Sequence, residues 1–135
     1  IGDEEMRERI EHHKNSRPQD WLLVEEPFNL SKVLSKYSSN TNTLIIECMT
    51  LWLTNWLCTN DMESYLEEKQ LFIDALITSK ANIIIVSNEV GSGIVPMGEL
   101  TRIFVDQSGW LNQALAQISN KVTLVVAGCP LVLKE

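Results

Sequence analysis

The sequence has little positive charge and no long apolar run, and both absences narrow the classes of protein to consider. Its 135 residues include 11 Lys and Arg against 18 Asp and Glu, which gives a net charge of -7. Such a charge argues against nonspecific binding of nucleic acid or of anionic membranes, although it leaves room for a local basic site for a nucleotide phosphate. No apolar run reaches the length of a membrane span, and the N-terminus has no basic-then-apolar signal pattern. We therefore expect neither a nucleic-acid partner nor a membrane span.

Cysteine is scarce, and the sequence has no repeats, low-complexity tracts or linkers. Cys48, Cys58 and Cys129 are odd in number and have no metal-site spacing, which favours a reduced, cytoplasmic protein. The composition, with 44% hydrophobic and 21% charged residues, is that of an ordinary globular protein. We therefore expect a single domain over residues 1–135.

Neither of the two common glycine-rich phosphate motifs is present. After Gly91 and Gly93, Pro96 stands where a dinucleotide fingerprint has its third glycine. Gly93 and Gly98 have the separation of the two phosphate-loop glycines, but Glu99 follows where that motif needs lysine. These glycines therefore belong to neither motif.

The stretch VSNEVGSGIVP, residues 86–96, nevertheless has the pattern of a ligand loop. It overlaps the end of a continuous apolar run at 83–86, which is typical of a central parallel strand covered on both faces. Open α/β sheets bind their ligands outside the carboxyl ends of such strands. We therefore predict a candidate substrate or nucleotide loop, with a tight strand-to-helix turn as the alternative. Its candidate residues are Asn88, Glu89, Gly91 and Gly93.

Apolar periodicity predicts strands that alternate with helices. Short apolar runs predict strands at 21–24, 44–46, 83–86 and 122–126. Helical spacing predicts helices at 3–14, 29–37, 51–57, 60–80 and 99–120. Asn29 and Asn60 are the expected N-caps of the second and fourth helices, and Gly109 is an expected break or kink in the last one. Alternating strands and helices call for a mainly parallel sheet layered between helices, so the predicted fold class is α/β.

Two groups of polar residues could carry chemistry. His12 and His13 precede Lys14 and Arg17 at the end of the first predicted helix, so they either complement the helix dipole or provide a histidine nucleophile beside phosphate-binding cations. Glu47 ends the second apolar run. A carboxylate in that place commonly holds Mg²⁺ in nucleotide-binding α/β proteins, and a surface glutamate just past the strand is the alternative.

Five segments match, in order, the segments of one known family. They are DEEMRERIEHHKNSRPQDW from Asp3, IIECMTLWLTN from Ile45, VSNEVGSGIVP from Val86, the series Leu100, Arg102, Phe104, Asp106, Gly109, Asn112 and Gln113, and VVAGCPLVLK from Val125. Together they span nearly the whole chain. The sequence thus resembles the bifunctional adenosylcobinamide kinase / adenosylcobinamide-phosphate guanylyltransferases of cobalamin biosynthesis.

This resemblance implies a fold, a reaction and a set of site residues. The fold would be a RecA-like P-loop NTPase fold with three layers. The enzyme would use ATP or GTP with Mg²⁺ to phosphorylate adenosylcobinamide, and would then transfer GMP from GTP onto that phosphate through a guanylylated histidine. The matching histidine is His13, with His12 as the alternative. The residues that match the nucleotide site are Lys14, Asn15, Ser16, Arg17, Glu25 and Glu47. The resemblance also implies a homo-oligomer, which we expect to be a trimer.

The sequence departs from the family pattern in two respects. Val105 stands where the family usually has an arginine after the phenylalanine. No G-x-x-x-x-G-K-[ST] occurs, although the family carries this phosphate loop on its first strand and helix. We therefore expect an N-terminally truncated chain that by itself binds neither ATP nor GTP usefully and shows neither activity. The competing function is that of an inactive remnant that serves as a binding or assembly module.

Overall fold

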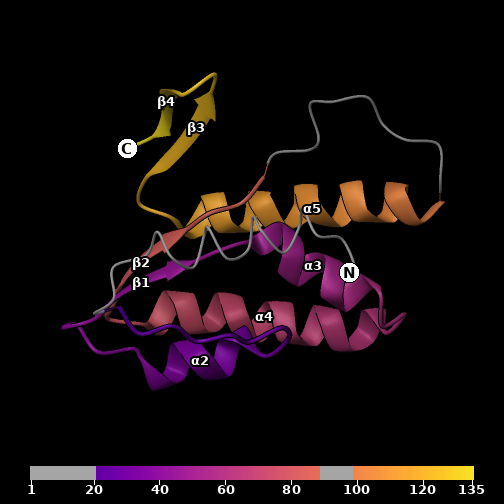
Figure 1. The fold of residues 1–135 in the computed structure, drawn as a ribbon, viewed down its shortest axis with the longest axis horizontal. Coiled ribbons are helices and arrows are strands. Elements are labelled where there is room, and N and C mark those ends of the chain that lie inside the picture. The colour runs from indigo at the N-terminus through magenta and orange to yellow at the C-terminus, as the bar shows by residue number, and fades with distance from the viewer. Residues whose placement is uncertain (1–20, 89–98) are drawn as a thin grey trace, which may run out of the picture.

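The computed structural model describes residues 21–88 and 99–135, and these contain both helices and strands (Figure 1). The first predicted helix, at 3–14, lies outside the described residues. The elements in chain order are α2 (Leu30–Lys36), β1 (Thr43–Ile46), α3 (Met49–Leu57), α4 (Met62–Thr78), β2 (Asn82–Ile85), α5 (Glu99–Ile118), β3 (Val122–Val126) and β4 (Cys129–Lys134). The α/β class is therefore confirmed for the part of the chain that the structure describes.

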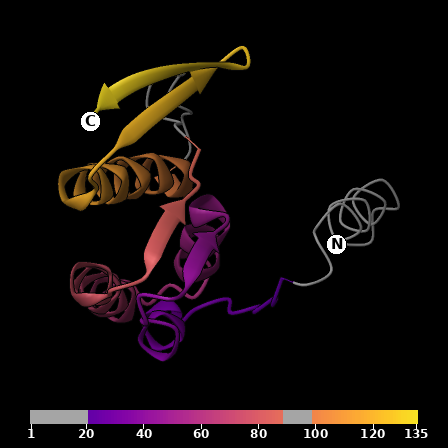
Figure 2. The ribbon, with the colours of Figure 1, turned by 90° about the vertical axis from the view of Figure 1, so that its left-hand side faces the viewer.

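Within the described residues, the strands form two separate two-stranded sheets. β1 and β2 are parallel, with Ile46 opposite Ile85. β3 and β4 are antiparallel, and their hairpin stands apart from β1 and β2 (Figures 1 and 2). The predicted mainly parallel sheet is thus reduced here to one parallel pair.

Residues 122–126 form a strand, as predicted, but the expectation that this strand is buried is wrong. Val125 and Val126 are 64% and 58% exposed. The two residues that follow, Ala127 and Gly128, have φ angles of 52° and 74°. Positive φ at both central residues is what a two-residue hairpin turn requires, so the chain reverses at once and β4 pairs with β3.

One face of the parallel pair packs against the core, and the other face is exposed. Leu44, Ile46, Ile83 and Ile85 lie on the packed face. Ile45 and Ile84, on the opposite face, are 45% and 55% exposed. The prediction that the strand at 83–86 is covered on both faces is therefore wrong for the described residues, because the described helices all pack on one core at the same face.

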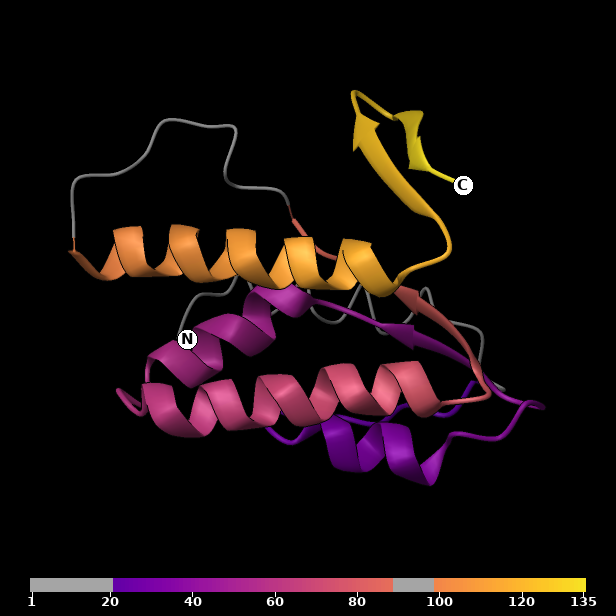
Figure 3. The ribbon, with the colours of Figure 1, turned by 180° about the vertical axis from the view of Figure 1, so that it is seen from behind.

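The core is built from buried apolar side chains of α2, α3, α4 and α5. It contains Leu34, Met49, Trp52, Leu53, Leu57, Tyr65, Phe72, Leu111 and Leu115. The Trp52 ring lies 5.7 Å from that of Tyr65 and 5.3 Å from that of Phe72, measured between centroids. Large aromatic side chains dominate the energetics of such a core, so this cluster holds α3 against α4. Figure 3 shows α2 packed along the outer side of α4.

Three local predictions are also wrong. Residues 21–24 form no strand and are exposed, and no described strand pairs with them, whereas a strand needs a neighbour to bond its backbone. The N-cap of α4 is Asp61, whose carboxylate accepts the Ser64 N–H at 3.1 Å, and not Asn60, which has a φ of 58°. Gly109 does not interrupt α5, which continues to Ile118, because packing of an amphipathic helix outweighs the intrinsic cost of one glycine.

Candidate functional site

Most of the predicted site residues lie outside the described residues. His12, His13, Lys14, Asn15, Ser16 and Arg17 belong to residues 1–20, and Glu89, Gly91 and Gly93 belong to residues 89–98. Their proposed roles stay predictions. The structure does describe Glu25, Glu47 and Asn88, so their surroundings can be examined.

Glu47 and Asn88 lie at the same edge of the parallel pair. Both strands run in the same direction, and the Val86 N–H donates to the Ile46 carbonyl at 2.9 Å. Glu47 directly follows Ile46, and Asn88 follows Val86 by two residues. The carboxyl edge of the pair therefore carries one exposed carboxylate and one exposed amide. Open α/β sheets bind their ligands at this edge.

Helix α3 begins at this edge and is tied to the segment that leaves β2 (Figure 1). The Met49 N–H donates to the Val86 carbonyl at 3.1 Å, and the Asn88 N–H donates to the Thr50 hydroxyl at 3.4 Å. The first turn of α3 carries no acidic residue. Because a helix N-terminus carries a partial positive charge, α3 adds a field that favours an anion at this edge.

Helix α5 contributes a side chain to the same edge. The Ser87 hydroxyl donates to Oδ1 of Asn112 at 2.9 Å, and Nδ2 of Asn112 donates to the Asn88 carbonyl at 3.4 Å. The sequence reasoning included Asn112 only as one position of a family match and missed this contact. The available signal was an amide that stands between Leu111 and Leu115, two buried leucines of α5.

The segment before α2 is fixed by a carboxylate that the sequence reasoning did not single out. Glu26 accepts hydrogen bonds from the Phe28 and Asn29 N–H groups, both at 3.0 Å. These two backbone hydrogen bonds, that from Asn29 more than that from Phe28, lower the pKa of the Glu26 carboxyl. Asn29 is the N-cap residue of α2, but its side chain makes no capping hydrogen bond, so that part of the prediction is wrong. Glu25 is exposed and lies next to this turn, on a segment separate from the edge that carries Glu47 and Asn88.

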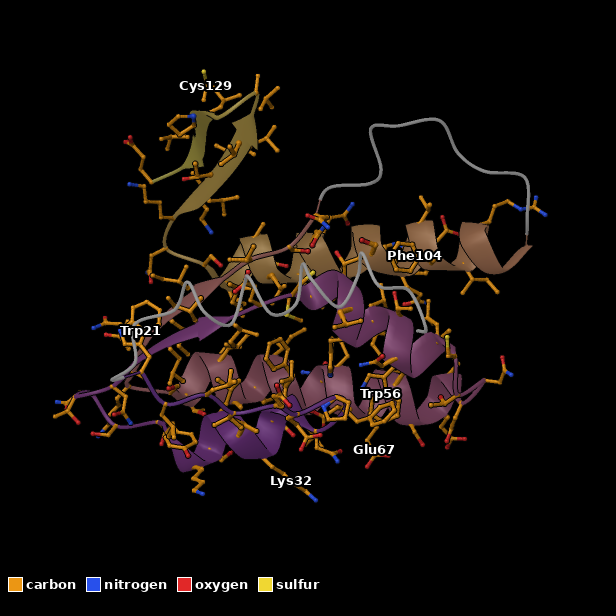
Figure 4. The ribbon with its side chains drawn as sticks, in the orientation of Figure 1. Trp21, Lys32, Trp56, Glu67, Phe104 and Cys129 are labelled. Carbon is orange, nitrogen blue, oxygen red and sulfur yellow. The ribbon has the colours of Figure 1, made fainter. Side chains whose placement is uncertain are left out.

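Two tryptophans attach the same segment to α3. The Phe28 carbonyl accepts from the indole N–H groups of Trp52 at 2.8 Å and Trp56 at 3.1 Å. The rings of Phe28 and Trp56 meet edge to face, with centroids 5.2 Å apart. Trp56, labelled in Figure 4, thus joins the start of α2 to α3, and the chain that carries Glu25 enters the fold at a fixed place.

The donor set at the edge bears on metal binding. Among the residues that the structure describes, no three His, Cys, Asp or Glu side chains are grouped as a metal cage would require. Mg²⁺, however, is commonly held by one or two carboxylates together with waters and substrate phosphates. A single carboxylate such as Glu47 therefore fits a magnesium ion that arrives with a nucleotide, and does not fit an ion bound by protein alone.

Two further observations concern the rest of the described chain. A hollow of about 460 Å³ between α2 and α4 is lined by Ser31, Lys32, Ser35, Leu71, Asp74, Ala75 and Thr78. It contains none of the predicted site residues, and the hydroxyls of Ser31 and Ser35 are already bonded within the protein. None of the described helices has the length and apolar character that a membrane crossing requires.

Comparison with known proteins gives concordant matches along almost the whole chain. Residues 1–133 match the family described as cobinamide kinase / cobinamide phosphate guanyltransferase. The bifunctional adenosylcobalamin biosynthesis protein CobP of Pseudomonas aeruginosa is 43% identical over 133 residues, which cover 98% of this chain and 77% of the relative. CobU of Escherichia coli is 37% identical over 141 residues, 95% of this chain and 78% of the relative. CobU of Salmonella typhimurium is 36% identical, with the same coverage of both chains.

Proposed function

The chain belongs to the cobinamide kinase / cobinamide phosphate guanyltransferase family, and from this premise we propose that the protein, as its gene encodes it, carries out both reactions in cobalamin biosynthesis. The first reaction transfers a phosphoryl group from ATP or GTP to adenosylcobinamide. The second transfers GMP from GTP to the resulting phosphate. The observation that carries the proposal is the match over residues 1–133, which includes the histidine segment as well as the described elements.

For the second reaction we propose that His13 is the nucleophile. A neutral imidazole nitrogen attacks the α-phosphorus of GTP, a P–N bond forms, and pyrophosphate leaves as the P–O bond breaks. An oxygen of the substrate phosphate then attacks the same phosphorus and releases the histidine. The cations Lys14 and Arg17 would stabilise the charge that builds on the phosphoryl oxygens. His12, the neighbouring imidazole, is the alternative nucleophile.

We propose that Glu47 positions the magnesium ion that accompanies the nucleotide. Its place at the carboxyl edge, beside the N-terminus of α3, supports this role. Mg²⁺ bound there would neutralise phosphate charge and orient the leaving group. Asn88 lies at the same edge and begins the proposed substrate loop, which would continue through Glu89, Gly91 and Gly93.

Replacement of Glu47 by glutamine tests this role, because the substitution removes the charge and nearly preserves the shape. We expect Glu47→Gln to raise the Mg²⁺ concentration for half-maximal activity by about tenfold or more, since one anionic ligand is lost. Glu67→Gln, at an exposed position on α4, is the matched control. An unchanged Mg²⁺ dependence in Glu47→Gln would remove Glu47 from the metal site.

Product analysis tests the function itself. The protein, purified as its gene encodes it, is incubated with adenosylcobinamide, GTP and Mg²⁺, and corrinoid products are identified by mass spectrometry. We expect adenosylcobinamide phosphate and its GMP adduct, and we expect His13→Ala to form only the first. Formation of neither product by the parent protein would refute the proposal.

The competing function is an inactive binding or assembly module. Residues 1–135 contain no G-x-x-x-x-G-K-[ST]. A phosphate loop supplies several charge-assisted hydrogen bonds of about 1.5–3 kcal/mol each. We propose that residues 1–135 alone therefore bind GTP very weakly and show neither activity. Titration calorimetry with GTP and Mg²⁺ tests this, and micromolar binding would show that the nucleotide site needs no phosphate loop.

A further inference from the structure

The segment that follows β2 is held by hydrogen bonds from α3 on one side and from α5 on the other. The proposed reaction gives these hydrogen bonds no role. On the α3 side, the Met49 N–H bonds to the Val86 carbonyl and the Thr50 hydroxyl accepts the Asn88 N–H, at 3.1 and 3.4 Å. On the α5 side, Asn112 meets the two residues that follow Val86. The short backbone segment from Val86 to Asn88 is therefore fixed by two helices that pack on one core.

The side chain of Asn112 uses both ends of its amide in this contact. Oδ1 accepts the Ser87 hydroxyl at 2.9 Å, and Nδ2 donates to the Asn88 carbonyl at 3.4 Å. A carboxylate in its place could accept from Ser87 but could not donate to Asn88, and an apolar side chain could do neither. The two bonds together define one orientation of the amide.

These hydrogen bonds contribute little to overall stability. The bond to Asn88 is long and exposed, the bond to Ser87 is only partly buried, and a typical net contribution is about 1 kcal/mol. Their geometric effect is larger, because both fix the place where the chain leaves the sheet. Functional groups act well only when neighbouring residues on rigid elements hold them.

We propose that Asn112 is a positioning residue, which fixes Ser87 and Asn88 and so sets the place of the Asn88 side chain at the edge that carries Glu47. This inference rests on the proposed function, since the ligand it serves is the Mg²⁺–nucleotide placed at that edge. Asn112 acts through Asn88 and does not itself need to touch the nucleotide.

Steady-state kinetics test the proposal through a double-mutant cycle. We expect Asn112→Ala and Ser87→Ala each to lower kcat/KM for the nucleotide by about tenfold, and the double variant to lose no more than either single variant. Asn112→Asp, which keeps the acceptor for Ser87, is expected to retain part of the activity. Gln117→Ala, an exposed amide on the same helix, is the control and should leave kcat/KM unchanged. Values within about twofold of the parent for Asn112→Ala, or losses that multiply in the double variant, would overturn the proposal.

Hydrogen–deuterium exchange separates a failure of this inference from a failure of the proposed function. In Asn112→Ala, the peptide covering residues 83–88 should exchange faster than in the parent and in Gln117→Ala, whether or not the protein turns over substrate. An inactive parent protein would refute the proposed function, but the exchange measurement would still test the positioning role of Asn112. Unchanged exchange would refute the positioning role even in an active enzyme.

Discussion

The buried carboxylate of Glu68 provides a sharp test of how the described helices are held together. Glu68 lies on α4 and is only 6% exposed. Its Oε2 accepts the Ser31 N–H at 2.9 Å, and its Oε1 accepts the Ser31 hydroxyl at 2.8 Å. Ser31 is the second residue of α2, where backbone N–H groups have no partner within the helix. Glu68, from another helix, therefore accepts an N–H of the first turn of α2, which the side chain of the N-cap residue Asn29 does not do.

The expected cost of removing this carboxylate follows from the two donors that it leaves. In Glu68→Ala, the N–H and the hydroxyl of Ser31 both lose their buried acceptor, at about 1–3 kcal/mol each, so the free energy of unfolding should fall by about 2–6 kcal/mol. Glu68→Gln keeps the shape but retains only one acceptor oxygen, and its NH₂ group faces the other donor. We expect it to cost about 1–3 kcal/mol.

Urea unfolding followed by tryptophan fluorescence measures these costs. The urea concentration at the unfolding midpoint should fall most in Glu68→Ala and less in Glu68→Gln. The slope of the free energy of unfolding against urea concentration should not change. Glu67→Ala is the matched control, since Glu67 is the exposed neighbour on α4 and is labelled in Figure 4. It should stay within about 0.5 kcal/mol of the parent. If Glu68→Ala also stayed within that range, the Ser31 donors would have another acceptor and our reading of the contact between α2 and α4 would be wrong.

Two further predictions concern the segment that enters α2. Hydrogen bonds from Asn29 and Phe28 lower the pKa of Glu26 below its ordinary value of 4.5. The ionised Glu26 carboxylate therefore stabilises the folded protein above pH 4.5, and this stabilisation is lost as the pH falls through the lowered pKa. Glu26→Gln should therefore flatten the dependence of the urea midpoint on pH below about pH 5, and parallel curves for variant and parent would contradict this. Trp52→Phe and Trp56→Phe each leave the Phe28 carbonyl one indole donor, whereas the double variant leaves it none. The loss in the double variant should exceed the sum of the single losses by about 1 kcal/mol or more, and simple additivity would show that the shared carbonyl does not couple them.

Strong local patterns predicted the elements that form from local and parallel contacts. The apolar spacing of residues 60–80 and 99–120 located α4 and α5, and the apolar runs before Glu47 and Ser87 located β1 and β2 to within a residue. The rule that parallel strands share a carboxyl edge also predicts that Glu47 and Asn88 lie at the same edge.

Features that depend on distant partners could not be predicted in this way. The run 122–126 has the composition of a buried strand, but its partner is decided by the turn at Ala127, and positive φ is uncommon for alanine. Residues 21–24 look like a strand in isolation and have no described neighbour to pair with. The contacts from Ser31 to Glu68 and from Ser87 to Asn112 span 37 and 25 residues, so no local pattern contains both partners.

Labelling with GTP decides most directly whether this chain belongs to an enzyme that transfers GMP through a histidine. The protein as its gene encodes it, and its His13→Ala and His12→Ala variants, are incubated with α-labelled GTP and Mg²⁺, and the label bound covalently to protein is measured after denaturation. We predict a base-stable, acid-labile label on the parent and on His12→Ala, and none on His13→Ala, because a phosphoramidate forms at His13. Label retained in His13→Ala but lost in His12→Ala would reverse the assignment, and a parent protein without label would contradict the proposed mechanism.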